Sequence, residues 1–210
     1  MSVSIIIATY GDEAWKRLAL TRAYPSATKQ DAAEIIAVHE PDMSIAQVRN
    51  AAAERATSEW LCFLDADDEL GPNYTEVMWR ALEQEREIDE TTPPLLTPAV
   101  RQIRRGRSSS PSFFDRGVSL RDDNWLVLGT LVQRELFLEV GGFNDYPHGF
   151  EDWSLWAKCW KAGAKIVKVR DAVYIYYWNP DSAHHKSWKD RKWQIEMHNK
   201  VRAELFPELA

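Results

Sequence analysis

The segment at residues 61–72, LCFLDADDELGP, decides the fold class. Four apolar residues lead directly into Asp65, Asp67, Asp68 and Glu69. A short run that is apolar throughout is typical of a strand that is buried on both faces of a sheet. Because strands of this kind occur mainly in parallel sheets covered by helices, we expect an α/β fold in which one inner strand ends in carboxylates.

Apolar runs alternate with helical patterns in the first part of the chain. The predicted elements are, in order, a strand at residues 3–9, a helix at 12–24, a strand at 34–38, a helix at 45–57 with Ser44 as its N-cap, and a strand at 60–64. Strands separated by helices form a parallel, doubly wound sheet, whose ligands bind beyond the carboxyl ends of the strands. The residues at those three ends are Thr9, Tyr10, His39, Glu40 and residues 65–68.

The rest of the chain combines helices with extended segments. Helices are predicted at residues 73–89, 134–140, 151–162 and 187–205. Extended segments are predicted at residues 95–102, 125–133, 165–169 and 172–178. Residues 104–112 (RRGRSSSPS) are basic, rich in small side chains and interrupted by Pro111, so we predict a mobile loop there.

The composition is that of a soluble globular chain of one domain, because 45% of its 210 residues are hydrophobic and 28% are charged. No apolar run approaches the roughly 20 residues of a membrane span, and residues 1–12 predict a first strand rather than a signal peptide. The formal net charge of −6 argues against a large nucleic-acid footprint. Cys62 and Cys159 lie in apolar contexts, which predicts reduced core residues in a cytoplasmic protein.

The acidic strand end predicts a metal site. Side chains alternate along an extended segment, so Asp65 and Asp67 point to the same side, where two close carboxylates would repel each other. Mg²⁺ and Mn²⁺ prefer oxygen ligands and commonly bind through one or two carboxylates together with substrate phosphates. We therefore expect Asp65 and Asp67 to hold a divalent cation, whereas Asp68 and Glu69 are interpreted as a solvated turn that leads into the next helix.

A strand that ends in Asp-x-Asp is not specific to one chemistry. Haloacid-dehalogenase-like phosphatases also use it, with Thr or Val two places after the second aspartate and with the nucleophile on the first strand. This chain has Glu69 at that place and carries its aspartates after the third predicted strand. A phosphatase therefore stays as a minor alternative.

Five segments, taken in order, resemble the family 2 glycosyltransferases of the GT-A fold. They are VSIIIATYGD at residues 3–12, EIIAVHEPD at 34–42, QVRNAAAERATSEWLCFLDADD at 47–68, VGGFND at 140–145 and GFEDWSLWAKCWKAG at 149–163. The resemblance runs through most of the chain and implies a GT-A (Rossmann-like), mostly parallel sheet flanked by helices. Only eight residues separate Glu40 from Arg49, where the family commonly has a further helix and strand, so we expect a trimmed sheet.

The resemblance implies a division of one GT-A domain into halves. Residues 1–90 would bind the nucleotide sugar and metal, residues 91–180 would bind the acceptor, and residues 181–210 would form a C-terminal loop and helix. The nucleotide-binding positions implied are Thr9, Tyr10, Glu40, Arg49, Asp65 and Ala66. Of these, Tyr10 would stack on the base, and Glu40, where the family more often has aspartate, would accept a hydrogen bond from it.

The remaining implied roles concern the metal and the chemistry. Asp67 and Asp65 would bind Mn²⁺ or Mg²⁺, with His184 or His185 as a candidate third ligand. Asp152 would be the general base, with Glu151 beside it. On the acceptor side the candidates are Trp153 and His148, although the spacing of Trp153, Trp156 and Trp160 is also that of a buried helix face.

These roles describe an inverting, metal-dependent transfer of a sugar from a nucleotide-diphosphate sugar, with UDP expected, to a hydroxyl acceptor. The acceptor stays open between a glycan, a protein, a small molecule and a modified nucleic acid. The basic residues 101–110 are interpreted either as a lid over the diphosphate or as a solvated loop, and the C-terminal helix is a candidate homodimer contact. The alternatives are a nucleotidyltransferase or metal-dependent phosphohydrolase, and a non-catalytic sugar-nucleotide binder.

Overall fold

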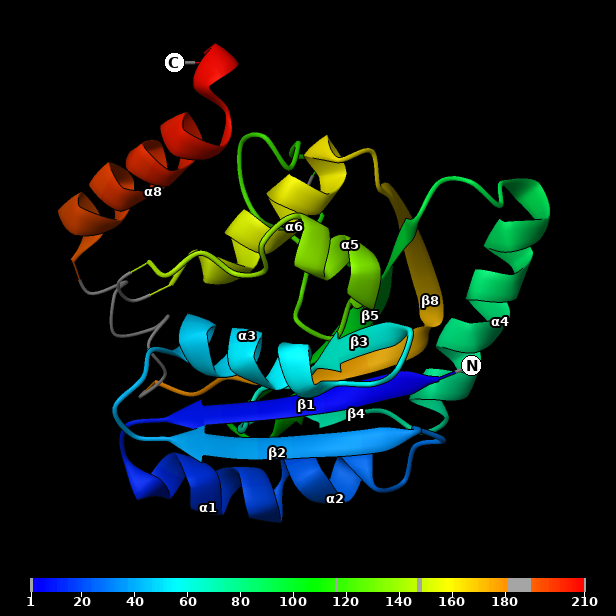
Figure 1. Ribbon diagram of the computed structural model, residues 1–210. Helices are drawn as coiled ribbons and strands as arrows, with labels where there is room; N and C mark the ends of the chain where they lie inside the picture. Colours follow the sequence, from blue (N-terminus) through cyan, green and yellow to red (C-terminus); the bar gives the residue numbers. More distant parts are fainter. Residues whose placement is uncertain (1, 116, 147–148, 181–189, 210) are drawn as a thin grey trace.

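The computed structural model of the chain describes residues 2–115, 117–146, 149–180 and 190–209 (Figure 1). The strands are β1 Val3–Tyr10, β2 Glu34–Glu40, β3 Trp60–Phe63, β4 Glu69–Leu70, β5 Pro94–Arg104, β6 Arg107–Ser108, β7 Leu131–Gln133 and β8 Lys165–Tyr177. The helices are α1 Glu13–Thr21, α2 Ala23–Ala27, α3 Ile45–Arg55, α4 Tyr74–Ile88, α5 Arg134–Glu139, α6 Glu151–Lys161 and α8 Arg191–Leu205, followed by a 3₁₀ turn at Pro207–Leu209.

One mixed sheet connects all these strands in the order β2-β1-β3-β7-β5-β8-β4, with β6 paired to β5. The pairs β1–β2, β1–β3 and β5–β8 are parallel, whereas β7 runs antiparallel to both β3 and β5. The carboxyl ends of β1, β2 and β3 therefore lie side by side, and Tyr10 stands opposite Glu40 in the register. The predicted α/β fold class is confirmed.

Alternation along the central strands divides the core between the two faces of the sheet. Ile6 and Phe63 face one cluster, which also contains side chains from α3, α5, α6 and α8. Ile5 and Cys62 face the other cluster, which includes side chains from α1, α2 and α4. Figure 1 shows α3, α5 and α6 on one side of the sheet and α1 and α2 on the other. Such two-sided cover explains why the inner strands are apolar throughout.

Several sequence predictions about the core are confirmed. Ser44 caps α3 in a capping box, in which the backbone N–H of Gln47 donates to Ser44 Oγ over 3.2 Å. Cys62 and Cys159 are buried and unpaired. Trp156 is fully buried, as its helix-face spacing predicts. Among the described residues, no helix is long and apolar enough to cross a bilayer.

The helix predicted at residues 12–24 is divided in two. α1 ends at Thr21 and α2 begins at Ala23, with the intervening Arg22 outside the helical region at φ −126° and ψ −70°. Pro25 explains the break, because it has no N–H to donate to the carbonyl four residues earlier. Proline is tolerated in the first turn of α2, where no such bond is needed.

Three extended segments differ from their predictions. β2 continues through Glu40, beyond its predicted end at residue 38, and is an edge strand that is only partly buried. The two strands predicted at residues 165–178 are one strand, β8, which pairs with β5 along its length across an irregularity at Pro98 and Ala99. The extended segment predicted at 125–133 is reduced to β7, because residues 128–129 form a turn.

The prediction of a mobile loop at residues 104–112 is wrong for the start of this segment, which forms a β-hairpin. Arg104 pairs with Arg107, and the two residues between them have positive φ, 49° at Arg105 and 73° at Gly106. Two successive positive φ values are those of a type I′ turn, the two-residue connection that matches the twist of a hairpin. The sequence signal is weak because arginine replaces the usual asparagine or aspartate at the first turn position.

The Gly-Gly-Phe segment is locked to α3 by the side chain of Asn50. Asn50 Nδ2 donates to the carbonyl of Phe143 over 2.9 Å, and Asn50 Oδ1 accepts from the backbone N–H of Phe143 over 2.9 Å. Gly142 lies at φ +59°, and a Cβ there would stand 2.4 Å from Asn50 Oδ1. The segment can lie this close to α3 only because position 142 has no side chain.

Replacing Gly142 by alanine should destabilise the protein by about 2–4 kcal/mol, because overpacking is added to backbone strain. Gly141 is the matched control, since it also has positive φ (+75°) but has open space where a Cβ would stand. We expect Gly141→Ala to cost only about 1 kcal/mol. Urea unfolding of the two variants measures the difference, and equal losses would contradict the close packing between Asn50 and Gly142.

Candidate active site

Three carboxylates lie together where β3 ends. Ligand oxygens of Asp65, Asp67 and Asp68 all fall within 4.8 Å of one another. The solvated turn expected at Asp68 is wrong, because this residue is only 1% exposed. Glu69 is not part of a solvated turn either, since it begins β4 and accepts a hydrogen bond from the hydroxyl of Tyr177 over 3.1 Å.

The acidic turn is held by β8. The backbone N–H of Tyr177 donates to Asp68 Oδ1 over 2.8 Å, and the hydroxyl of Tyr174 accepts from the backbone N–H of Asp65 over 3.4 Å. Immediately after the turn, β4 pairs antiparallel with the same strand. The acidic turn is therefore fixed by a strand that lies more than a hundred residues later in the chain.

Two further residues hold Asp67. Arg22 Nη1 donates to the backbone carbonyl of Asp67 over 2.9 Å, while its guanidinium lies 4.2 Å from the centre of the Tyr177 ring. Asn179 Nδ2 donates to Asp67 Oδ2 over 3.0 Å. Arg22 comes from the break between α1 and α2 and Asn179 from the segment after β8, so neither position carries a local sequence signal for this role.

The electrostatics of the cluster fit a divalent cation. Burial raises the pKa of Asp65 to about 6, and the charge of Asp67 contributes to the rise while Arg49 opposes it. Burial also raises the pKa of Asp68, and the charges of Asp67 and Asp65 add to this effect. Clustered, partly desolvated carboxylate oxygens are the donor set that Mg²⁺ and Mn²⁺ prefer, and a bound cation removes their mutual repulsion.

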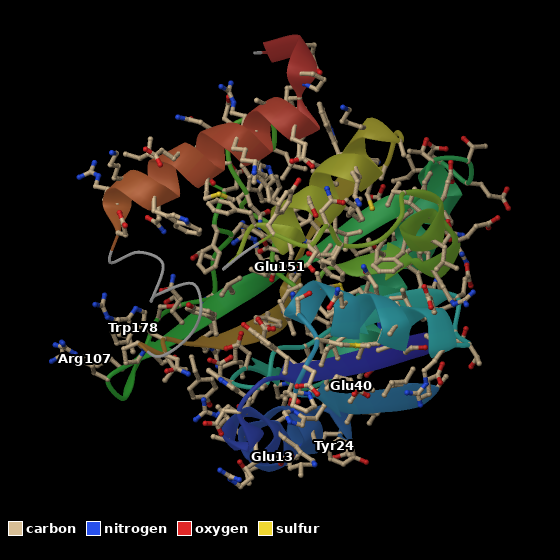
Figure 2. The ribbon with its side chains drawn as sticks, turned by 60° about the vertical axis from the view of Figure 1, so that its left-hand side comes forward. Glu13, Tyr24, Glu40, Arg107, Glu151 and Trp178 are labelled. Carbon is tan, nitrogen blue, oxygen red and sulfur yellow. The ribbon has the colours of Figure 1, made fainter. Side chains whose placement is uncertain are left out.

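A buried arginine joins this cluster to the start of α6. Arg49 is 5% exposed, and its Nη2 lies 2.7 Å from Asp65 Oδ1 while its Nη1 lies 2.8 Å from Glu151 Oε1. One guanidinium thus bridges a carboxylate at the end of β3 and another on α6. Glu151, the carboxylate on α6, is labelled in Figure 2. A planar guanidinium can satisfy two carboxylates in a fixed geometry, which a lysine cannot do.

Asp152 has a different environment from Glu151. Its Oδ2 accepts a hydrogen bond from Asn124 Nδ2 over 2.9 Å, and no ion pair among the described residues includes it. Burial raises its pKa to about 7, and the neighbouring charge of Glu151 contributes. A carboxyl group that titrates near neutrality suits a general base.

The predicted nucleotide-binding residues fall into two sets. Tyr10 is half-buried at the end of β1 beside the exposed Glu40, and its pKa is raised by burial and by the charge of Glu151. Thr9 is buried, and its hydroxyl donates to the carbonyl of Val38 over 3.2 Å and contacts His39 Nδ1 at 3.0 Å. Ala66 is also buried. Thr9 therefore secures β2 to β1 through its side chain, and only Tyr10 and Glu40 present accessible groups at these strand ends.

The predicted acceptor-side residues are only partly described. Trp153 is fully buried, and its ring stacks on His198 of α8 with the centroids 4.9 Å apart. Its Nε1 donates to the carbonyl of Leu120 over 2.7 Å. It is therefore a core residue and not an open sugar platform. His148, His184 and His185 lie outside the described residues.

The comparison with known proteins finds a protein family whose sequence model matches part of the chain. The sequence model of glycosyl transferase family 2 matches residues 29–124, which include β2, the Arg49 helix and the acidic turn. Over this segment, which is less than half of its length, the chain is similar to glycosyl transferase family 2. No curated protein sequence matches the chain.

Solved structures support the fold class of the chain. S. aureus TarS matches with a TM-score of 0.61 and 18% identity over 86% of this chain and 37% of that chain. S. aureus TarS 1–349 in complex with UDP-GlcNAc matches with a TM-score of 0.65 and 17% identity over 89% of this chain and 61% of that chain. The chain thus spans less than two thirds of the length of these structures, and at such identities the likeness shows the GT-A-like fold alone.

The Arg49 bridge generates a stability prediction. Arg49→Met should cost about 2–3 kcal/mol at neutral pH, because it leaves the mostly buried carboxylate of Glu151 and the partly exposed carboxylate of Asp65 without a counter-charge. The loss should shrink at about pH 5, since the pKa of Asp65 lies near 6 and a protonated carboxyl needs no counter-charge. Chemical denaturation at both pH values measures the effect.

Arg55→Met is the matched control for this experiment. Arg55 lies on the same helix but is exposed, and no ion pair among the described residues includes it. Its replacement should change stability by about 0.5 kcal/mol or less. Similar losses in the two variants, or an Arg49→Met loss that does not depend on pH, would contradict a buried electrostatic bridge.

Proposed function

We propose that the protein is an inverting, metal-dependent glycosyltransferase that moves a sugar from a nucleotide-diphosphate sugar to a hydroxyl acceptor. The Arg49 bridge is the observation that carries this proposal. It brings a cluster of three carboxylates next to the carboxyl of Asp152, whose pKa is raised to about 7. Inverting transfer needs these two features, a place that stabilises the leaving diphosphate and a base that faces the acceptor.

The two acidic residues at the start of α6 take different roles in this proposal. Glu151 is committed to Arg49, so its carboxylate maintains the bridge. Within the described part of the chain, Asp152 accepts hydrogen bonds from neutral donors, the side-chain amide of Asn124 and the backbone N–H of Trp153. Asp152 therefore removes the proton from the acceptor hydroxyl as that oxygen attacks the face of the sugar opposite the leaving group.

Asp65, Asp67 and Asp68 supply the oxygen ligands for Mn²⁺ or Mg²⁺ in this proposal. When bound, such a cation acts as a Lewis acid toward the diphosphate. Asn179 and Arg22 keep Asp67 in place from either side. Arg22 and Arg49 also add positive charge beside the position that a diphosphate would occupy.

UDP is the nucleotide that we propose for the donor. Structures of S. aureus TarS contain UDP-GlcNAc or UDP, and they share the fold of this chain. Tyr10 and Glu40 stand side by side at the end of the sheet, where an aromatic face and a carboxylate suit a base. A cytoplasmic location and the division at residue 90 stay predictions from the sequence.

The alternatives predict different products. A nucleotidyltransferase or phosphohydrolase would use the carboxylate cluster but has no need of Asp152, and a binder would turn over no donor. Incubation of the protein with a panel of sugar nucleotides and Mn²⁺, followed by mass spectrometry, separates them. Release of free sugar with the intact nucleoside diphosphate supports glycosyl transfer to water, whereas release of a nucleoside monophosphate would support a phosphohydrolase.

Metal dependence predicts synergy between the ligands. UDP together with Mn²⁺ should raise the Tm by more than the sum of their separate effects, because a cation at Asp67 joins the protein to the diphosphate. Asp67→Asn should abolish the synergy, and differential scanning fluorimetry measures it. Asp31→Asn is the control, since Asp31 is an exposed carboxylate that precedes β2. Additive effects in the parent protein, or full synergy in Asp67→Asn, would contradict the metal site.

The proposed base predicts a loss of turnover without a loss of binding. Asp152→Asn should lower the rate of donor turnover by about 100-fold or more and leave the affinity for UDP with Mn²⁺ within about threefold. In the parent protein, kcat/KM should fall as the pH drops through about 7, because Asp152 becomes protonated and can no longer accept a proton. The rate assay over a pH series checks both expectations.

Asp145→Asn is the matched control for Asp152→Asn. Asp145 is exposed and lies shortly before the same helix, so it tests for a general effect of losing one carboxylate there. It should keep both the rate and the pH profile of the parent protein. Turnover retained in Asp152→Asn would remove this residue from the role of base.

A further inference from the structure

The β5–β6 hairpin carries the strongest positive charge that the proposed chemistry does not use. Its arginines are Arg101, Arg104, Arg105 and Arg107, and the last three are exposed. No ion pair within the described part of the chain includes any of them, and residues 101–114 contain no carboxylate. This concentration stands out in a chain whose formal net charge is −6.

The arginines lie on an ordered hairpin, although their positions in it do not favour its stability. Arg104 and Arg107 are directly opposite each other in the register, and like charges in that position destabilise a hairpin. Arg105 occupies a positive-φ position where asparagine or aspartate is usual. None of these arginines stabilises the hairpin. Binding of an anionic ligand therefore explains their presence better than exposure to solvent alone does.

The hairpin is continuous with the carboxylate cluster. Arg105 and Gly106 line a surface depression together with Arg22, Tyr177 and Asn179. Asn179 in turn donates to Asp67. Trp178 also lines this depression, and the guanidinium of Arg104 lies 4.7 Å from the centre of its ring. This contact orients the side chain of Arg104 beside the depression. Figure 2 shows Arg107 and Trp178 together at the outer end of the sheet.

We propose that the β5–β6 hairpin binds the acceptor, and that this acceptor is a phosphate-bearing chain other than a nucleic acid, which the formal net charge of −6 disfavours. Guanidinium groups bind phosphate through paired, charge-assisted hydrogen bonds. The donor has a single diphosphate, which the cluster at Asp67 accounts for, whereas the arginines extend along both strands of the hairpin and suit a ligand with repeated charges. This inference rests on the proposed glycosyl transfer, because it assigns the acceptor of that same site.

Binding of labelled inorganic polyphosphate, followed by fluorescence anisotropy, tests the inference. The variant is Arg105→Asn combined with Arg107→Gln, which removes two charges and converts the turn to the favoured Asn-Gly. The control combines Lys29→Gln with Lys200→Gln, which removes two exposed charges from other surfaces. We expect the hairpin variant to bind polyphosphate about tenfold more weakly than the parent protein, and the control to stay within about threefold.

Three outcomes of the binding assay would overturn the inference. In the first, the hairpin variant and the control bind polyphosphate with equal affinity. In the second, the parent protein binds polyglutamate of matched charge as tightly as polyphosphate. In the third, the parent protein binds single-stranded oligothymidylate of matched charge more tightly than polyphosphate, which would indicate a nucleic-acid acceptor. The stabilisation by UDP with Mn²⁺ is measured in the same three proteins. Its absence from the parent protein would contradict the proposed function itself, whereas its loss only in the hairpin variant would assign the arginines to the donor and overturn the inference.

Discussion

The buried guanidinium of Arg49 is the interaction on which the arrangement of the site depends. It contacts Asp65 at the end of β3 and Glu151 at the start of α6, two residues that are far apart in the sequence. Removing a guanidinium from water costs free energy. Arg49 can be buried because the carboxylates of Asp65 and Glu151 offset that cost from two sides. The bridge consequently sets the position of α6 relative to the sheet, and with it the position of Asp152.

The same bridge separates the roles of neighbouring carboxylates. Glu151 is neutralised by Arg49, whereas Asp152 faces an amide and has its pKa raised to about 7. On the other side of Arg49, the three clustered aspartates repel one another, and β8 holds them together nonetheless. A fold that retains such repulsion is less stable than it need be, which is expected where a ligand provides the missing charge.

The acidic turn and the basic hairpin are two ends of one surface. Asn179 and Tyr177, which connect them, lie at the end of β8 and just beyond it, and that strand also fixes Asp68. A phosphate-bearing acceptor on the hairpin would therefore lie beside the carboxylate cluster without competing for its oxygens. The opposite signs of the two ends give the surface a direction along which a charged chain can be oriented.

The sequence by itself determined the α/β class, the order of the main elements, and the meeting of three strand ends at one edge, because apolar periodicity and parallel connectivity are local properties. It also indicated Asp65, Asp67 and Asp152 through motifs that stand close to predictable elements. Only the tertiary structure decided that Asp68 is buried, that Arg49 bridges two elements, and that Arg22, Asn124 and Asn179 complete the site. Those contacts join residues distant in the chain, and burial, hydrogen bonding and pKa all follow from what surrounds a side chain in space.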